Sequence, residues 1–524
     1  MLGKTIGQLY DYCCLHYRDR TAIIQGLQRW SFGQLAERGN RLTNSLRRLG
    51  LQKEDRLAVL MPNCPEVLLV DYACAKLGLV RVPLAHYLRP DDVLLMVKET
   101  ETKVLVYHEL FKEIIQTVRK AYGGFQHVLC LSAAGTTGLA DELSFRQLVD
   151  EGSPGAVPEA VNENDLYIIA YTGGTTGLPK GVVHNHRTFV ASMAMELLDF
   201  GIGRDEVFLA FTPLTHASGA LVMPVWLRGG RLVILPGFDA KLFLETVQQE
   251  KVTTSFLVPT VIYTLLDYPD LEKYDTSSLR NLIYGAAPIA PERLKEAIQT
   301  FGPIFTQLYG QAEAPMALTA LSREEHIIEG NEQLVGRLAS CGRPTLAVKL
   351  KLVDAQDQEV PLGQSGQIIA QAPNTMIGYF KRPELTAETL KDGWLYTGDV
   401  ARQDEYGYFY IVDRAKDMIV SGGFNIFPKE LEDILHEHPA VAIAAVIGVP
   451  DEKWGEAVKA VVVLRPGQKV GEKELIDFCK RKKGSLMAPK SVDFSDSLPL
   501  TPLGKANKKA LRDKYWQGRD RRVS

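Results

Sequence analysis

The chain has 524 residues, of which 46% are hydrophobic and 23% are charged, and its formal net charge is −3. A chain of this length and ordinary composition is expected to bury normal cores in two or more globular domains. A charge so close to zero gives no electrostatic reason to expect a nucleic acid as a partner.

The first 150 residues predict alternating strands and helices. Short apolar runs at residues 56–60 and 103–106 are typical of buried strands, and residues 66–76 between them have a helical pattern. Alternation of this kind predicts a mostly parallel sheet that is covered by helices on both faces.

The same alternation returns between residues 165 and 310. Residues 188–200 and 291–301 have helical patterns. The predicted strands are residues 166–170, 207–211, 231–235, 255–258, 282–284 and 304–308. This region therefore predicts a second stretch of mostly parallel α/β structure.

After about residue 340 the pattern changes. Val348, Leu350 and Leu352 alternate with polar residues, as in a half-exposed antiparallel strand. Further on we expect strands at 441–449 and 457–464, and a helix at 428–438 with proline in its first turn. The end of the chain thus predicts a small α+β domain.

The most informative segment is residues 171–181, Tyr-Thr-Gly-Gly-Thr-Thr-Gly-Leu-Pro-Lys-Gly. Glycines let the backbone approach a ligand, and hydroxyls and N–H groups donate to it. Lys180 adds a positive charge, so the segment favours binding of a polyphosphate. It differs from the P-loop, because Lys180 is followed by Gly181 rather than by serine or threonine. A plain surface loop is the alternative for Gly-Gly-Thr-Thr-Gly alone, and the attached Pro-Lys-Gly argues against it.

Two more loops of small or polar residues follow predicted strands. Gly-Ala-Ala-Pro at 285–288 comes after residues 282–284, and Tyr-Gly-Gln-Ala-Glu at 309–313 comes after residues 304–308. Ligands of open α/β sheets bind at the carboxyl ends of strands. We therefore expect these loops and the lysine loop to meet at one site.

The order and spacing of these motifs, from Trp30-Ser-Phe-Gly-Gln-Leu to Leu-Gly-Lys505, resemble the adenylate-forming superfamily. That superfamily includes acyl-CoA synthetases, peptide-synthetase adenylation domains and firefly luciferase, and the chain is most similar to fatty and aromatic acyl-CoA ligases. The resemblance implies two half-reactions: a carboxylic acid and ATP give acyl-AMP and pyrophosphate, and the CoA thiol then displaces AMP. It implies ATP, Mg²⁺ and coenzyme A as cofactor and co-substrates.

The resemblance also implies the α/β domain organisation. A large N-terminal domain, residues 1–415, would contain stacked, mostly parallel sheets with helices and a small β region. A small mobile α+β domain, residues 416–524, would rotate about a hinge at Lys416 and act as a lid.

The resemblance implies a role for each residue of the nucleotide site. Glu313 would hold Mg²⁺, since a hard cation prefers carboxylate oxygen. Tyr309 would stack on adenine, Asp399 and Arg414 would bind the ribose, and Lys505 would bridge the carboxylate and the α-phosphate. The residues implied to contact ATP or AMP are Thr172, Gly173, Gly174, Thr175, Thr176, Gly177, Lys180, Gly285, Ala286, Ala287, Gln307, Tyr309, Gly310, Gln311, Asp399, Arg414 and Lys505.

The second orientation of the small domain would bring a different surface to the same site. The implied CoA tunnel is formed by Ser421, Gly422, Gly423 and Phe424. The paired glycines leave room for the pantetheine arm where a side chain would block it.

The acyl pocket is implied at loops that carry mostly small residues. Its positions are His216, Ser218, Gly219, Val222, Ala286, Gly310, Pro315 and Met316. None is a lysine, arginine or aspartate that would receive a charged substrate, so we expect an apolar medium- or long-chain fatty acid or a cyclic or aromatic acid. His216 either gates the pocket or packs in the core, and both readings stay open.

Three positions depart from the pattern of the family. Ala312 stands where threonine usually precedes the magnesium glutamate, and a lost charge-assisted hydrogen bond costs on the order of 1.5–3 kcal/mol unless Gln311 or a water replaces it. Thr215 stands before His216 where an aromatic residue is common. Gly173 replaces a frequent serine, and glycine there favours the fatty acyl-CoA branch.

Three other functions share the adenylation motifs. A stand-alone adenylating enzyme could load a carrier protein in trans, a luciferase-like oxygenase would need oxygen chemistry that no motif marks, and an inactive nucleotide sensor would explain Ala312. Four residues that catalysis requires argue against the sensor, namely Lys180, Glu313, Asp399 and Lys505.

The remaining patterns bear on location and partners. The seven cysteines are odd in number and form no CxxC pair, which favours reduced thiols in a cytoplasmic protein. The sequence contains no apolar run of about 18 residues, so no membrane span is predicted. The first residues lack an apolar signal core. The basic tail after Lys505 leaves peripheral contact with anionic lipid open. Small molecules are the expected partners, and the oligomeric state stays open, with a homodimer as one option.

Overall fold

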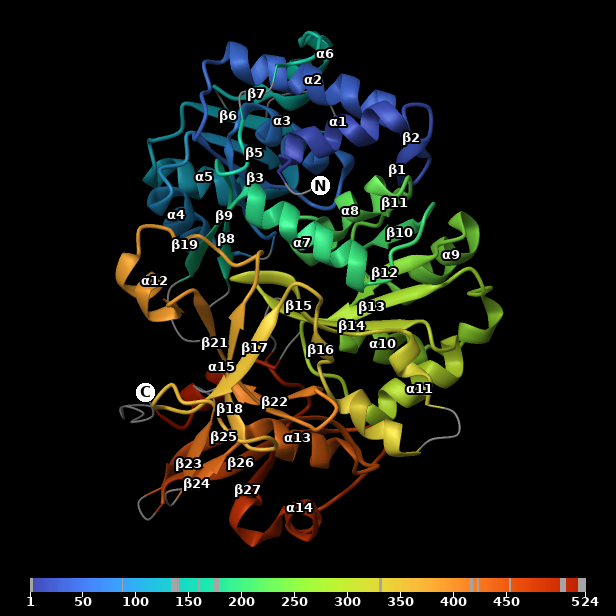
Figure 1. Ribbon diagram of the computed structural model, residues 1–524, viewed down its shortest axis with the longest axis vertical. Coiled ribbons are helices and arrows are strands. Elements are labelled where there is room, and N and C mark those ends of the chain that lie inside the picture. Colours follow the sequence, from blue (N-terminus) through green and yellow to red (C-terminus); the bar gives the residue numbers. More distant parts are fainter. Residues whose placement is uncertain are drawn as a thin grey trace.

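A computed structural model of the chain describes residues 3–86, 88–132, 139, 141–158, 161–172, 179–328, 332–414, 418–421, 424–451, 454–499 and 506–516. These residues form four sheets: the two large sheets lie side by side in the upper part of Figure 1, and the two smaller sheets lie below them.

The first sheet has eight strands in the order β19-β9-β8-β4-β3-β5-β6-β7. Its strands are β3 (Arg56–Leu60), β4 (Val80–Pro83), β5 (Val104–His108), β6 (His127–Leu131), β7 (Leu143–Ser144), β8 (Leu166–Thr172), β9 (Lys180–Asn185) and β19 (Gly378–Tyr379). The strands from β8 to β7 are parallel, whereas β9 and β19 are antiparallel additions at one edge.

The second sheet has nine strands in the order β16-β15-β14-β13-β12-β10-β11-β1-β2. They are β1 (Thr21–Gln25), β2 (Gln28–Ser31), β10 (Val207–Ala210), β11 (Arg231–Ile234), β12 (Thr254–Leu257), β13 (Asn281–Gly285), β14 (Phe305–Gln311), β15 (Ala314–Leu321) and β16 (Arg343–Pro344). The central strands from β14 to β1 are parallel, and both edges are antiparallel.

Helices cover both faces of the two large sheets and share one core between them. Alternate residues of β3 face opposite ways: Leu57 and Val59 join the shared core, whereas Ala58 and Leu60 pack toward α4 and α5. The shared core includes α1 (Ile6–His16), α2 (Phe32–Arg48), α3 (Pro65–Leu77), α7 (His186–Asp199) and α8 (Ala217–Leu227). The outer helices are α4 (Pro90–Glu99) and α5 (Lys112–Ala121) on the first sheet, with α9 (Ala240–Glu250), α10 (Pro259–Leu266) and α11 (Pro291–Phe301) on the second. Burial on both faces is what parallel strands require.

Local sequence explains where many helices begin. Ser31 starts α2 with a capping box, in which its hydroxyl accepts from the N–H of Gln34 and the Gln34 side chain accepts in return from Ser31. Proline occupies the first turn of α3, α4, α10, α11, α12 (Pro383–Thr389) and α13 (Pro428–His436). The short α6 (Phe145–Glu151) begins after Ser144.

Two smaller sheets complete the chain. The antiparallel third sheet contains β17 (Lys349–Val353), β18 (Ser365–Gln371), β20 (Leu390–Lys391), β21 (Trp394–Gln403) and β22 (Phe409–Arg414). The fourth contains β23 (Ile419–Ser421), β24 (Phe424–Ile426), β25 (Val441–Asp451), β26 (Gly455–Leu464) and β27 (Ser491–Phe494), packed with α13, α14 (Glu472–Met487, kinked at Gly484) and α15 (Lys508–Asp513).

The α/β fold class predicted from the sequence is confirmed, and so are the stacked, mostly parallel sheets. The grouping of strands differs from the simple chain order. Residues 166–172 join the first sheet, and the β1–β2 hairpin crosses to the second. The expected hinge at Lys416 lies outside the described residues, so the division at 415/416 stays a prediction. Across the described part of the chain, no helix is long and apolar enough to cross a membrane, and all seven cysteines are free and buried.

Candidate active site

The predicted phosphate loop lies at the carboxyl end of β8. Thr172 closes that strand and pairs with Lys180, the first residue of the antiparallel β9. The loop residues between them, Gly173, Gly174, Thr175, Thr176 and Gly177, lie outside the described residues. Backbone pairing therefore holds Thr172 and Lys180 opposite each other at the two ends of the predicted loop.

The second predicted loop is a tight turn between β14 and β15, in which Gln311 pairs with Ala314. Gly310 is required there by space, because a Cβ atom at this position would lie 2.6 Å from the backbone nitrogen of Met316. Met316 itself has a positive φ of 64°. The turn presents Glu313, whose Oε1 accepts a hydrogen bond from the Tyr379 hydroxyl at 2.6 Å.

Tyr379 also contacts the phosphate loop. The Lys180 ammonium lies 5.4 Å from the centre of the Tyr379 ring, a separation at which a cation is attracted to the face of an aromatic ring. One tyrosine thus links the predicted phosphate lysine of the first sheet to the predicted metal carboxylate of the second. Sequence analysis did not identify Tyr379, and no motif within β19 marks it.

The residues predicted for adenine and ribose lie together. The Tyr309 hydroxyl donates to Oδ2 of Asp399 at 2.7 Å, and both residues are buried. Burial, with Asp399 beside it, raises the pKa of the Tyr309 hydroxyl, so this group remains a donor. The backbone of Arg414 pairs with that of Asp399 between β22 and β21. The predicted adenine-lining residue Gln307 accepts from the Tyr284 hydroxyl at 3.2 Å.

The Gly-Ala-Ala loop follows β13 as predicted. Gly285 ends the strand, where a Cβ atom would lie 2.5 Å from the Leu308 carbonyl oxygen, and Ala286 has a positive φ of 63°. Ala287 continues the loop beyond the strand. The close approach of β13 to β14 thus explains the glycine at 285.

His184 is a second residue that the sequence analysis missed. Its Nε2 lies 2.7 Å from the carbonyl oxygen of Ala312 and therefore carries the proton, while Nδ1 lies 3.1 Å from the Thr188 hydroxyl. Burial lowers the pKa of His184 to about 4, so the imidazole is neutral near pH 7. A neutral histidine thus anchors the Glu313 turn at Ala312, the position where a threonine was expected.

Next to Ala312, Gln311 has an unmet hydrogen-bond donor. Its Nε2 is buried and has no hydrogen-bond partner among the described residues. A buried donor without a partner is costly unless a ligand or water satisfies it. That Gln311 replaces the missing threonine contact stays a prediction.

The predicted acyl side is formed by the loop before α8 and its first turn. His216 precedes the helix, and burial lowers the pKa of its imidazole to about 4. Gly219 has no room for a side chain, since a Cβ atom would lie 1.8 Å from the Leu214 carbonyl oxygen. Ser218 and Val222 are buried on α8. The preference for an apolar substrate stays a prediction.

Asn63 fixes this loop from the first sheet. Its amide nitrogen lies 3.1 Å from the carbonyl oxygens of Phe211, Thr212 and Leu235, and its Oδ1 accepts from the Leu214 N–H at 2.9 Å. A residue that follows β3 therefore clamps the ends of β10 and β11. This contact between distant segments left no local sequence signal.

The far side of the acyl position is held by Pro315. Its carbonyl oxygen accepts from Asn374 Nδ2 at 2.7 Å and from the Ser192 hydroxyl at 3.0 Å. The following residue, Met316, is buried. The backbone around the predicted pocket is thus fixed by buried polar contacts.

The residues at the turn fit a magnesium ion that is held mainly by substrate. In the described part of the chain no group of three or more histidine, cysteine, aspartate or glutamate side chains could hold a metal. Mg²⁺ in nucleotide sites typically takes one or two carboxylates together with phosphates. Glu313 offers such a carboxylate, with one oxygen oriented by Tyr379.

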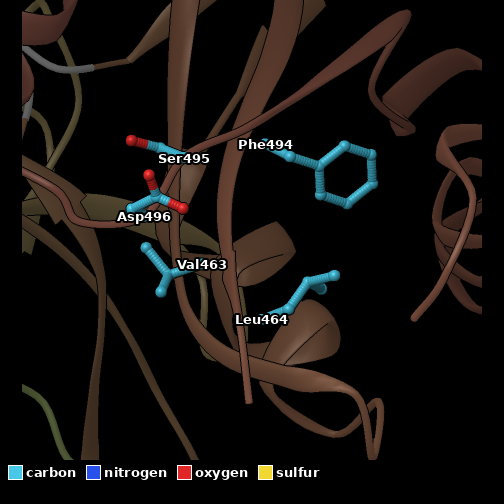
Figure 2. Close-up of a pocket in the computed structure, with 5 residues that line it drawn as sticks. All are labelled: Val463, Leu464, Phe494, Ser495 and Asp496. Carbon is cyan, nitrogen blue, oxygen red and sulfur yellow. The ribbon is translucent and has the colours of Figure 1, made fainter. Parts of the chain in front are cut away.

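The predicted residues of the small domain are only partly described. Ser421 pairs with Phe424 between β23 and β24, whereas Gly422, Gly423 and Lys505 lie outside the described residues. A hollow of about 470 Å³ on this domain lies at the ends of β26 and β27 (Figure 2). It is lined by Val463, Leu464, Phe494, Ser495 and Asp496, and none of the residues predicted for ATP, acid or CoA is among them.

Comparison with known proteins identifies the family of the chain. A family model described as AMP-binding enzyme matches residues 11–380, and one described as AMP-binding enzyme C-terminal domain matches residues 430–505. The chain is 39% identical to a medium/long-chain-fatty-acid–CoA ligase of Mycobacterium tuberculosis, over 99% of this chain and 91% of that protein. It is 36% identical to a feruloyl-CoA synthase of an Amycolatopsis species, over 94% and 96% of the two chains. The crystal structure of ATP-bound MatB from Rhodopseudomonas palustris matches with a TM-score of 0.88 at 28% identity, over 97% of this chain and 99% of that one.

Proposed function

The chain belongs to the AMP-binding enzyme family, and from this membership and the site we propose that it is an ATP-dependent acyl-CoA ligase. In the first half-reaction a carboxylate oxygen attacks the α-phosphorus of ATP, and pyrophosphate leaves. In the second, the CoA sulfur attacks the acyl carbon of acyl-AMP, and AMP leaves with the oxygen that the carboxylate supplied. The similarity to acid–CoA ligases over nearly the whole chain supports both steps.

One observation carries the assignment to this site. Lys180 and Glu313 belong to different sheets, yet both contact Tyr379. Phosphoryl transfer is catalysed mainly by positioning and by charge stabilisation. We infer that Thr172 and Lys180 bind the β- and γ-phosphates, and that the buried Gln311 amide donates to a phosphate oxygen. Glu313 would hold Mg²⁺, which when bound supplies positive charge to the triphosphate.

The other roles follow from the positions of the remaining groups. Asp399 accepts from the ribose hydroxyls, with its second oxygen held by Tyr309. Tyr309 thereby orients the Asp399 carboxylate that would bind the ribose, in addition to its expected contact with adenine. Lys505 would bridge the carboxylate and the α-phosphate in one orientation of the small domain, and the segment from Ser421 to Phe424 would line the CoA tunnel in the other.

For the acid, we infer an apolar medium- or long-chain or aromatic carboxylic acid. The support is the buried, uncharged character of Ser218, Val222 and Met316. His216 is neutral because of burial and so adds no charge to the pocket. A cytoplasmic location remains a proposal that rests on the cysteine pattern.

Product analysis tests this function. Purified protein is incubated with ATP, Mg²⁺ and a pool of fatty and aromatic acids, with and without CoA, and the products are identified by mass spectrometry. We expect one or a few acyl-CoA species that require CoA. Acyl-AMP that accumulates even with CoA would favour loading of a carrier protein, and absence of AMP with every acid would contradict the proposal.

A further inference from the structure

A short segment around β19 connects the two large sheets at the site. On one side the N–H of Phe380 donates to the Gly181 carbonyl at 2.8 Å, next to Lys180 on β9. On the other side the N–H of Met376 donates to the carbonyl oxygen of Glu313 at 2.7 Å. The backbone of residues 376–380 thus spans the distance between the phosphate lysine and the metal carboxylate.

The side chain of Tyr379 also connects the two sheets, through its aromatic ring and through its hydroxyl. Its ring face lies 5.4 Å from the Lys180 ammonium, and its hydroxyl donates to Oε1 of Glu313 at 2.6 Å. The backbone N–H of Tyr379 donates to the Thr386 hydroxyl at 2.9 Å, and the residue is buried. The backbone of Tyr379 is therefore held by Thr386 and its hydroxyl is held by Glu313.

The hydroxyl occupies one of the two carboxylate oxygens of Glu313. A carboxylate oxygen that accepts a short hydrogen bond is a weaker metal ligand than its neighbour, so Glu313 would hold Mg²⁺ through its other oxygen, Oε2. Groups that orient a metal ligand in this way typically affect metal affinity by about 10- to 100-fold.

We propose that Tyr379 is a positioning residue, which sets the metal-binding carboxylate of Glu313 and the phosphate-binding ammonium of Lys180 in register across the two sheets. The inference rests on the proposed function. It adds that the metal dependence of the enzyme and its affinity for ATP are coupled through one side chain, the hydroxyl acting on the metal and the ring acting on the phosphate lysine.

A purely structural role predicts something different. Buried tyrosine hydroxyls generally find an acceptor, and the chain offers a matched pair away from the site. The Tyr107 hydroxyl lies 2.9 Å from both carboxylate oxygens of Glu142. Tyr107 is on β5, four strands from β9 in the same sheet, which is on the order of 19 Å at 4.8 Å per strand. Loss of that hydroxyl should lower stability and leave metal binding unchanged.

The test measures binding, independently of turnover. Mn²⁺ is titrated into the full-length protein with saturating ATP and followed by electron paramagnetic resonance, and ATP affinity and the melting temperature are measured in parallel. Tyr379→Phe keeps the ring and removes the hydroxyl, and we expect about tenfold weaker Mn²⁺ binding with ATP affinity in metal-free buffer nearly unchanged. Tyr379→Leu also removes the ring, and we expect a further loss of roughly two- to fivefold in metal-free ATP affinity.

Tyr107→Phe is the control variant, and Tyr379→Phe is the variant that can contradict the proposal. Tyr107→Phe should bind Mn²⁺ as the wild type does. If Tyr379→Phe is folded and binds Mn²⁺ with wild-type affinity, the positioning role is refuted, and this variant decides the matter even if Tyr379→Leu does not fold. Failure of the wild type to form acyl-AMP from any acid would refute the proposed function instead, while the Mn²⁺ titration would still decide the role of Tyr379.

Discussion

Replacement of Gly310 by alanine tests how closely the Glu313 turn is packed. The added Cβ atom would lie 2.6 Å from the Met316 nitrogen, 2.8 Å from its carbonyl carbon and 3.0 Å from the Ala314 oxygen. An ordinary contact needs about 3.4 Å or more, and backbone atoms cannot rotate away as a side chain can. Relief therefore requires a shift of several tenths of an ångström in the strand that follows Glu313. We expect Gly310→Ala to lower the free energy of unfolding by about 1–3 kcal/mol.

The same shift should affect adenylation more than stability. A displacement on the order of 1 Å at a catalytic group can reduce the rate roughly 100-fold. The assay is pyrophosphate release with ATP and the preferred acid, alongside urea unfolding. Gly237→Ala is the matched control, because nothing lies within 4 Å of a Cβ atom there. If Gly310→Ala and Gly237→Ala have the same stability and the same rate, the claim that close packing at Gly310 positions the Glu313 turn is wrong.

The remaining predictions concern the small domain and the buried histidines. Lys505→Ala should abolish acyl-AMP formation but spare thioester formation from supplied acyl-AMP, and equal loss of both steps in single-turnover assays would argue against two orientations. Gly423→Leu should do the reverse, so normal CoA turnover would exclude the tunnel. Burial lowers the pKa of His184, His216 and His326 to about 4, so the unfolded chain binds more protons than the native protein between pH 6.5 and 4. The contribution of these histidines to stability should be complete above pH 6.5 and fall as the pH drops toward 4, by up to about 3 kcal/mol per histidine. Burial raises the pKa of Glu196 to about 8, so this single carboxyl offsets part of that fall. Urea unfolding at stepped pH measures this, and a constant free energy of unfolding over that range would contradict it.

Local patterns predicted much of the fold because burial on both faces leaves apolar runs that are visible in sequence. The helix expected at residues 291–301 has those same bounds. The strand expected at 166–170 begins where predicted and continues past residue 170 to Thr172. The short hairpin β1–β2 and the two-residue strand β19 were missed. Ile23 of β1 also pairs with Leu232, and Gly378 of β19 pairs with Val183. These two pairings join segments that are far apart in the sequence, so no local periodicity marks them.

The site likewise contains residues that local sequence predicts and residues that only the three-dimensional structure identifies. The order of glycine, threonine and lysine in one loop indicates phosphate binding, and in the structure Tyr379 contacts both Lys180 and Glu313. His184, Tyr379 and Asn63 could not be predicted, because each acts through a hydrogen bond to a residue from another sheet or a distant loop. Such contacts depend on how the two sheets are stacked, which becomes visible only in three dimensions.

The most direct test of the account follows the oxygen of the acid. The preferred acid, labelled with ¹⁸O in its carboxylate, is converted with ATP and CoA, and AMP and pyrophosphate are analysed by mass spectrometry. Attack of the carboxylate on the α-phosphorus predicts one ¹⁸O atom in AMP and none in pyrophosphate. Unlabelled AMP, or label in phosphate released together with ADP, would contradict the acyl-adenylate pathway.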